Sequence, residues 1–276
     1  MKIGVALGGG GVRGMAHVLA LEAIDAAGVT PAALAGTSMG AIVGALYASG
    51  RSGKDIRELV ERHVVSRDDG LKEILQKRAN LIKWLAIVRP AWKGTGLLRA
   101  DGFLHYLLDE IQVTAFEDLK IPLRVMATDY VRGDPVVLEA GELLPALRAS
   151  MSIPGVFVPV EYEGRILVDG GVTNNLPYDQ LPRDCDKTIA IDVAPTRDAT
   201  VSEPPNAIEA VLGMFDILID QATKRMMREK EPSIYVRPEL VGVPILDFER
   251  IEQVWEQARP VMDELPAKLR TLLSTG

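Results

Sequence analysis

The amino-terminal segment KIGVALGGGGVRGMAH, residues 2–17, constrains the fold more than any other part of the chain. Residues 2–7 form a short, mostly apolar stretch that ends at a glycine, which is typical of a buried strand. Apolar residues recur at helical spacing after the glycines, so the segment predicts a strand, a glycine loop and a helix. Gly9, Gly11 and Gly14 then match the GxGxxG pattern of dinucleotide-binding loops, and phosphate binding is the first hypothesis for this loop.

Strand and helix patterns alternate along the rest of the chain. Strands are expected at 32–36, 121–130, 135–141, 165–171, 187–195 and 233–238, and helices at 39–50, 207–229 and 251–272. Such alternation predicts an α/β fold with a mainly parallel sheet that helices cover. Pro260 and Pro266 lie inside the last helical pattern, which predicts a kinked helix or two helices there. No linker or repeat divides the sequence, so we expect one domain over 1–276 with a C-terminal helical segment at about 245–276.

Composition excludes several classes of protein. The 276 residues carry a net charge of −7, whereas a nucleic-acid-binding protein needs a basic face. The one cysteine, Cys185, rules out an intramolecular disulfide framework, and no histidine or cysteine cluster has metal-ligand spacing. The sequence shows neither a secretory leader nor the ~18 consecutive apolar residues of a membrane span. We therefore expect a cytoplasmic protein that needs no metal and no cofactor.

A second motif changes the interpretation of the first. Dinucleotide folds place an acidic residue at the end of the second strand, but here strand 32–36 leads into GTSMG, residues 36–40. A GxSxG sequence between a strand and a helix is the nucleophile elbow, in which small residues flank a sharply turned serine, here Ser38. Consecutive glycine N–H groups on the neighbouring loop then suit an oxyanion hole better than a phosphate site.

A serine nucleophile needs a base, and the three histidines are poor candidates. His17 lies in the first predicted helix, and His63 and His105 lie in helical stretches with polar faces. None follows a late strand, where an α/β-hydrolase places its catalytic histidine. Asp169 does end a late apolar strand, before two glycines, and a carboxylate there can take the serine proton directly. A simple turn is the alternative use of this DGG sequence.

Three motifs in this order resemble the patatin-like phospholipase family: the glycine loop at 9–14, the elbow at 36–40 and the DGG sequence at 169–171. The connecting sequences at 149–160 and 174–177 are similar too, and the resemblance covers about two-thirds of the chain. It implies a compact, bacterial-type enzyme with a three-layer α/β/α fold related to cytosolic phospholipase A2. Such an enzyme hydrolyses acyl esters through a Ser–Asp dyad. Some members have Asp-Gly-Ala in place of Asp-Gly-Gly, a variation that leaves the acid in place.

By motif position, the resemblance implies Ser38 as the nucleophile and Asp169 as the base. The N–H groups of Gly10 and Gly11 would form the oxyanion hole. The remaining motif positions are Gly9, Arg13, Gly14, Gly36, Gly40, Gly170 and Gly171.

Three polar residues near these motifs need a separate interpretation. For Arg13 two roles stay open: an ion pair that holds the glycine loop, which we favour, or contact with a substrate phosphate. Ser150 and Ser152 also lie near a glycine but lack the elbow, and they are interpreted as loop residues.

Residues 72–93, KEILQKRANLIKWLAIVRPAWK, depart from the acidic average of the chain. They hold six basic residues against one acidic residue, together with Trp84 and Trp92. Basic side chains that flank leucine, isoleucine and tryptophan suit a lid or a segment at a membrane interface. The alternative is a helix that packs its apolar face on the core and keeps its lysines in solvent. On the first hypothesis the protein contacts the inner membrane peripherally through this segment.

The sequence therefore predicts a serine acyl-ester hydrolase of the phospholipase A or lysophospholipase type, with a lipid or acyl ester as substrate. Two hypotheses from other classes remain. One is a nucleotide-binding protein that uses the GxGxxG loop and is indifferent to loss of Ser38. The other is a regulatory or scaffold protein that keeps the fold without turnover.

Overall fold

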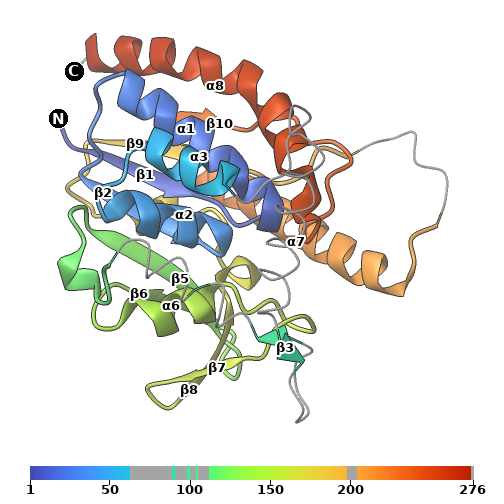
Figure 1. Ribbon diagram of the computed structural model, residues 1–276. Helices are drawn as coiled ribbons and strands as arrows, with labels where there is room; N and C mark the ends of the chain where they lie inside the picture. The colour runs from blue at the N-terminus through green and yellow to red at the C-terminus, as the bar shows by residue number, and fades with distance from the viewer. Residues whose placement is uncertain (63–88, 91–97, 100–103, 105–111, 198–203, 275–276) are drawn as a thin grey trace.

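The computed structural model describes residues 1–62, 89–90, 98–99, 104, 112–197 and 204–274. Their main feature is an eight-stranded sheet in the order β10-β9-β1-β2-β5-β8-β7, with β6 also paired to β5 (Figure 1). The strands are β1 Ile3–Leu7, β2 Ala33–Thr37, β5 Leu123–Asp129, β6 Pro135–Leu138, β7 Val160–Tyr162, β8 Arg165–Asp169, β9 Lys187–Ile191 and β10 Ile234–Val236. Two further strands, β3 Arg89–Pro90 and β4 Leu98–Arg99, pair only with each other. The pairings from β10 to β5 are parallel and those beyond β5 are antiparallel, so the predicted α/β class is confirmed as a mixed sheet.

Helices connect and cover these strands. They are α1 Ala16–Ala26, α2 Met39–Ala48, α3 Gly53–Glu61, α6 Leu143–Ser150, α7 Ala207–Glu229 and α8 Ile251–Ser274. Short 3₁₀ helices are η1 Gly11–Met15, η2 Phe116–Asp118, η3 Gly170–Val172, η4 Tyr178–Gln180 and η5 Phe248–Arg250. The predicted strands lie within a few residues of the observed ones, whereas α6 and β7 were not predicted. In Figure 1, α8 lies along α1, with α3 beside α1.

The C-terminal pattern forms one helix, so of the two alternatives, a kinked helix or two helices, the second is wrong. α8 contains both Pro260 and Pro266, each of which removes a backbone hydrogen bond. Its apolar face is nevertheless buried from Ile251 to Leu269, and the Trp255 Nε1–H donates to the Met15 carbonyl at 3.0 Å. Burial along the whole face therefore keeps the helix continuous across the two prolines.

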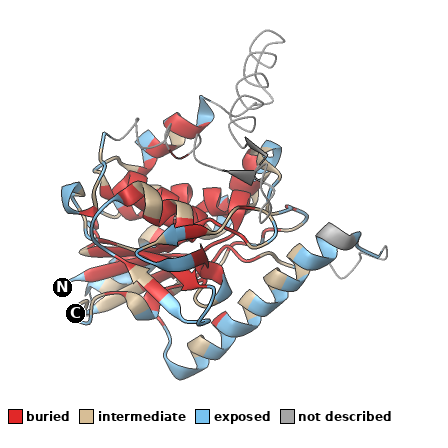
Figure 2. Cartoon of the chain, turned by 90° about the horizontal axis from the view of Figure 1, so that it is seen from below, coloured by how far each residue is buried: buried red, intermediate tan, exposed pale blue. Residues whose placement is uncertain are grey.

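The two faces of the sheet differ in side-chain size because successive residues of a strand point to opposite sides. One face carries large aliphatic residues: Ile3, Val5, Leu7, Leu34, Val125, Ile189 and Ile191. The other face carries Ala6, Ala33, Ala35 and Ala190. Helices cover the first face. The alanines of the second face allow other side chains to approach closely. The side chains that pack there are Leu176, Tyr178, Leu181 and, from α7, Met226 and Met227. Figure 2 shows the buried core and, beside it, the largely exposed α7.

The edge of β5 brings two chain turns together. Val125 and Met126 pair with both β2 and β6, so β2 and β6 lie on opposite edges of β5. Ala127 and Thr128 pair with both β6 and β8, so β8 lies on the same edge as β2. Thr37 ends β2 opposite Met126, and β8, running the other way, ends opposite Ala127. The two strands therefore meet end to end, and the chain leaves the sheet at the same place from each.

Close backbone packing holds the turn after β2. A Cβ atom at Gly40 would overlap the carbonyl oxygen of Leu7 on β1, and one at Gly36 would overlap the backbone of Gly40 and Ala41. Both glycines of the elbow are thus required by contact with backbone, which cannot move aside as a side chain can. The first turn of α2 consequently lies directly against the end of β1.

We expect Gly40→Ala to lower the free energy of unfolding by about 1–3 kcal/mol, because the added methyl group meets a carbonyl oxygen in a packed core. Gly44→Ala is the matched control on the same helix. Its Cβ would lie 3.3 Å from the Leu123 Cδ1 methyl, a side-chain atom, and alanine favours the helix by up to about 1 kcal/mol. Urea unfolding measures both variants, and equal losses of stability would contradict this account of the elbow.

His17 joins α1 to the end of β1. The side chain is fully buried, its Nε2 lies 2.7 Å from the Gly8 carbonyl oxygen, and its Nδ1 has no partner among the described residues. The carbonyl can only accept, so Nε2–H is the donor. Burial lowers the pKa of His17 to about 4, while the hydrogen bond to Gly8 opposes this effect. His17 is therefore a packed helix residue, as its position in the sequence indicates.

Acidification is expected to destabilise the protein through His17. The unfolded chain binds the proton near the ordinary pKa of 6.5 and the folded chain only near 4. The contribution of His17 to the free energy of unfolding is therefore fully present above pH 6.5. It is lost as the pH falls toward 4, by at most about 1.4 kcal/mol per pH unit. Thermal melts of the wild type and His17→Gln, whose amide can donate the same bond, measure the effect. The wild type should lose more stability, and parallel curves would contradict the prediction.

Candidate active site

Ser38 sits at the junction of β2 and α2 in a strained conformation. Its φ is 53° and its ψ is −122°, a region that non-glycine residues rarely occupy. Its backbone N–H donates to the Ser150 Oγ at 2.8 Å, and the residue is 6% exposed. This is the geometry of a nucleophile elbow, in which a sharp turn projects the hydroxyl from the end of the strand.

Asp169 lies beside Ser38 because β8 ends against β2. Its Oδ1 accepts a hydrogen bond from the Gly171 N–H at 2.7 Å, and the Ser38 side chain lies beside it in the same pocket lining. The residue is 6% exposed. Burial raises the pKa of Asp169 to about 7, while the Gly171 N–H and the neighbouring Ser38 side chain act in the opposite direction and favour the carboxylate. A carboxyl group with a pKa near neutrality and a serine hydroxyl as neighbour is suited to proton transfer.

The four glycines of the loop differ in the hydrogen bonding of their backbone N–H groups. The Gly8 N–H donates to the Ile191 carbonyl and the Gly9 N–H to the Asn175 carbonyl, each at 3.0 Å. The N–H groups of Gly10 and Gly11 have no acceptor within the part of the chain that the structure describes. Gly11 has a φ of 57°, and a Cβ there would overlap the Ile245 backbone. The loop is therefore fixed on both sides, while the described residues provide no acceptor for two consecutive N–H groups.

Asn175 holds this loop against the segment after Asp169. Besides the bond from Gly9, its side-chain Nδ2 donates to the Gly9 carbonyl at 3.1 Å. The preceding residue, Asn174, accepts a hydrogen bond from the Thr37 hydroxyl through its carbonyl at 2.9 Å. The two asparagines thus connect the glycine loop, the end of β2 and the DGG turn. In the sequence these two residues are visible only as the dipeptide Asn-Asn. Nothing in the sequence shows which loop they bind.

Arg13 makes an ion pair and is 2% exposed. Its two terminal nitrogens bind the carboxylate of Asp216 on α7 at 3.1 and 2.6 Å, and its Nε–H donates to the Gly10 carbonyl at 3.2 Å. These contacts fulfil the structural role favoured for Arg13, since its donors are directed to the glycine loop and α7. A bidentate pair of this kind defines the orientation of both partners.

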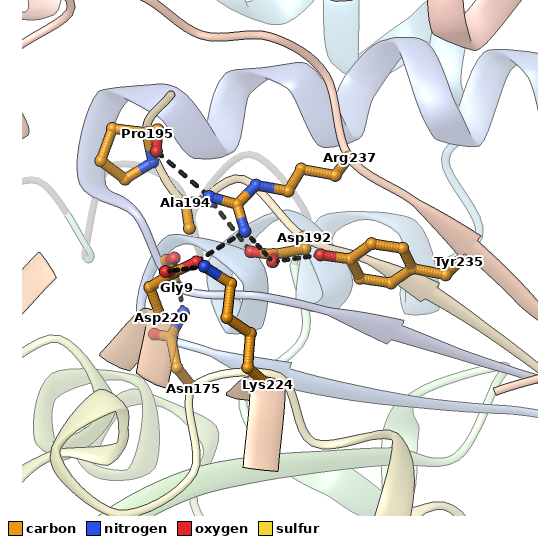
Figure 3. Close-up of polar contacts among 9 residues, drawn as sticks. All are labelled: Gly9, Asn175, Asp192, Ala194, Pro195, Asp220, Lys224, Tyr235 and Arg237. Carbon is orange, nitrogen blue, oxygen red and sulfur yellow. Dashed lines mark hydrogen bonds and ion pairs between the residues drawn. The ribbon is translucent and has the colours of Figure 1, made fainter. Parts of the chain in front are cut away.

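A second arginine joins α7 to the core (Figure 3). Arg237 donates to Asp220 of α7 at 2.7 Å, to the Pro195 carbonyl at 3.1 Å and, more distantly, to Asp192 at 3.5 Å. Asp192, which is 1% exposed, also accepts a hydrogen bond from the Tyr235 hydroxyl at 2.7 Å. The negative charge of the buried Asp192 carboxylate is thus compensated by the Tyr235 and Arg237 side chains. The same network positions the segment after β9 next to the glycine loop.

A pocket opens above the serine and the aspartate. Its polar lining consists of Gly9, Gly10, Arg13, Ser38, Asp169, Asn175 and Asp216, and its apolar lining includes Ile153, Pro154, Val172, Leu212, Phe215, Ile219 and Ile245. Three of the apolar side chains, at 212, 215 and 219, come from α7. A small polar floor beneath an apolar wall suits a substrate with one reacting polar group and a hydrocarbon chain.

The structure brings some of the predicted residues together and separates others. Gly9, Gly10, Ser38, Asp169 and Gly171 line the pocket, whereas Gly11 is not part of the lining. The other motif glycines lie behind it in packed turns: a Cβ would meet Met39 at Gly14 and the Met126 backbone at Gly170.

Ser150 was wrongly interpreted as a loop residue. It is the last residue of α6, fully buried, and its hydroxyl binds the Ser38 backbone. Ser152 does lie in the loop after α6, and its carbonyl accepts the Asp169 N–H at 2.9 Å. The helical spacing of apolar residues over α6 could have placed Ser150 in a helix. Its contact with Ser38 could not be predicted in this way, because 112 positions separate the two residues. The predicted interfacial segment 72–93, apart from β3, lies outside the described residues, as do His63 and His105.

In the described ranges of the chain, no group of three or more histidine, cysteine, aspartate or glutamate side chains is placed to bind a metal ion. Likewise, no helix within those ranges combines the length and the apolar character needed to cross a bilayer.

Known proteins share this sequence pattern. A model of the family described as patatin-like phospholipase matches residues 5–182. An uncharacterized NTE family protein of Mycobacterium bovis is 33% identical over 235 residues, which are 83% of this chain and 61% of that relative's length. The lysophospholipase NTE1 of Saccharomyces cerevisiae is 25% identical over 276 residues, covering 92% of this chain and 16% of its own.

Among solved structures, VipD from Legionella pneumophila aligns with 95% of this chain and 67% of its own, at 16% identity and a TM-score of 0.48. The family match is of a different kind, since it is a sequence match over more than half of the chain and includes both the elbow and the DGG turn. The chain therefore belongs to the patatin-like phospholipase family.

Proposed function

We propose that the protein is a serine acyl-ester hydrolase that acts on lipids, of the phospholipase A or lysophospholipase type. The observation that carries the proposal is the placement of the Ser38 side chain beside the buried carboxyl of Asp169, both in the lining of one largely apolar pocket. Membership of a phospholipase family and similarity to a protein named lysophospholipase support the choice of substrate class.

In this mechanism Ser38 is the nucleophile and Asp169 the general base. The Asp169 carboxylate takes the hydroxyl proton as the Ser38 oxygen attacks the ester carbonyl, whose electron pair moves onto the carbonyl oxygen. Collapse of the tetrahedral intermediate expels the alcohol, which receives the proton from Asp169, and leaves an acyl-serine. Water then attacks the acyl group with the same aspartate as base, which releases the fatty acid and restores Ser38.

The glycine loop supplies the oxyanion hole in this proposal. The N–H groups of Gly10 and Gly11 have no acceptor among the described residues, and Gly10 lines the pocket. Fixed backbone donors of this kind typically contribute ~10²–10³ in rate each, because they need no reorganisation as the negative charge develops. The contacts of Arg13 and Asn175 keep the loop in place before the substrate binds.

A fluorophosphonate probe tests the dyad without assuming a lipid. The wild type should be labelled, Ser38→Ala should not be labelled, and Asp169→Asn should be labelled at least about 10²-fold more slowly, because no base remains to take the proton. Ser152→Ala is the matched control: it is a buried serine of the same region whose hydroxyl donates to the Arg148 carbonyl, and labelling should persist.

Labelling that survives in Ser38→Ala would contradict the assignment of the nucleophile. Absence of labelling in folded wild-type protein would favour the nucleotide-binding or scaffold hypothesis. Folding of Asp169→Asn is verified by thermal melts at pH 8. Since burial raises the pKa of Asp169 from 3.8 to about 7, the wild type loses stability between these two pH values, and the loss is complete at pH 8. Asparagine does not ionise, so this variant should melt no lower than the wild type there.

Hydrolysis should depend on the ionisation of Asp169. Only the carboxylate can act as base, and its pKa is about 7, so kcat/KM for a non-ionising ester should rise about tenfold per pH unit below pH 7 and level off above it. A pH–rate profile between pH 5 and 9 measures this, at pH values where the protein stays folded. A midpoint near 4, the ordinary value for an aspartate, would contradict the role assigned to the buried carboxyl.

A further inference from the structure

Helix α7 carries apolar residues on two sides. Leu212, Phe215 and Ile219 face inward and line the pocket above Ser38. Val211, Met214, Ile217 and Leu218 are 48%, 51%, 44% and 59% exposed. These four residues are called the outer stripe below. Val211, Met214 and Leu218 lie three, four or seven positions apart and share one face of the helix, and Ile217, three positions after Met214, lies at the border of the same face. Most surface helices keep their solvent side polar, so an exposed apolar stripe indicates a binding surface.

Ion pairs hold α7 to the core at the level of the stripe. Asp216 binds Arg13, and Asp220, one turn later, binds Arg237. The inward apolar side chains of this half are only partly buried, whereas the second half is held by the buried Thr223 and by Met226 and Met227. Figure 2 accordingly shows α7 as a long, largely exposed helix along one side of the body. The core therefore orients the helix so that the outer stripe faces solvent.

The next two turns of α7 carry positive charge. Residues 221–228 contain Lys224, Arg225 and Arg228, all exposed, and no acidic residue. Lys224 pairs with Asp220, while the other two basic residues extend the surface of the stripe. The chain as a whole has a net charge of −7, so this basic run is a local exception. An apolar stripe next to basic side chains on one helix is complementary to a lipid surface with anionic headgroups.

The size of the stripe also argues for lipid rather than for a second copy of the chain. A stable protein–protein interface buries about 800 Å² on each partner, which requires some 20 or more residues. Four apolar side chains along one helix supply far less. A bilayer, in contrast, binds a single amphipathic helix through a few inserted side chains and the charges beside them.

We propose that the outer stripe of α7, together with Arg225 and Arg228, docks the protein on an anionic lipid surface. The same helix forms a wall of the pocket, so docking places the pocket next to the lipid. Ser38 and Asp169 are each only 6% exposed, and an acyl chain reaches them along the inner side of α7. The use of the pocket rests on the proposed hydrolase function, whereas docking itself does not.

Vesicle flotation tests the proposal with the full chain. On vesicles with one-third phosphatidylserine, the double variant Ile217→Gln/Leu218→Gln should bind about tenfold or more weakly, because two side chains no longer insert. Leu273→Gln is the matched control: it removes an apolar side chain that is 41% exposed, near the end of α8, and should bind as the wild type does. Arg225→Gln/Arg228→Gln should lose about fivefold per charge on these vesicles and little on neutral ones.

Three results would overturn the proposal: no vesicle binding by the wild type, equal binding by Ile217→Gln/Leu218→Gln, or a dimer in sedimentation that this variant dissociates. The last result would identify a second copy as the occupant of the stripe. A soluble short-chain p-nitrophenyl ester separates docking from catalysis, and the stripe variant should hydrolyse it at the wild-type rate. A wild type that binds vesicles but fails to hydrolyse this ester would refute the hydrolase function and leave docking supported.

Discussion

The structure of the site depends on two strands that meet end to end on one edge of β5. β2 arrives parallel to β5 and stops opposite Met126, while β8 arrives antiparallel and stops opposite the next residue, Ala127. Neither chain can continue along that edge, because the other occupies it. Both therefore turn out of the sheet at one point, and the residues at the two turns, Ser38 and Asp169, become neighbours although 131 positions separate them in the sequence.

The tightness of this junction explains the other features of the site. A turn that follows the strand immediately forces Ser38 to a φ of 53° and requires glycine where the first turn of α2 contacts β1. The same packing excludes water from the Asp169 carboxyl, which raises its pKa to about 7. Strain at the serine and burial at the aspartate thus have one structural cause.

Polar contacts then connect this junction to the surface of the molecule. The Arg13–Asp216 and Arg237–Asp220 pairs reach from the glycine loop and from the segment after β10 to consecutive turns of α7. One helix thereby forms a wall of the pocket, restrains the glycine loop through Arg13 and carries an exposed apolar stripe on its other side. The alanine-rich second face of the sheet allows the Met226 and Met227 end of α7 to pack closely.

The sequence by itself determined the order of strands and helices around the glycine loop, the elbow at Ser38 and the strand that ends at Asp169. These features are encoded in contiguous residues, by apolar periodicity and by glycines at sharp turns. The tertiary structure alone decided that β8 shares an edge of β5 with β2, that Ser150 and Asn175 hold the elbow and the loop, and that Arg13 pairs with an aspartate 203 residues away. It also decided that α8 stays one helix across its prolines. Such pairings depend on the free energy of packing between distant segments, which no local pattern of residues contains.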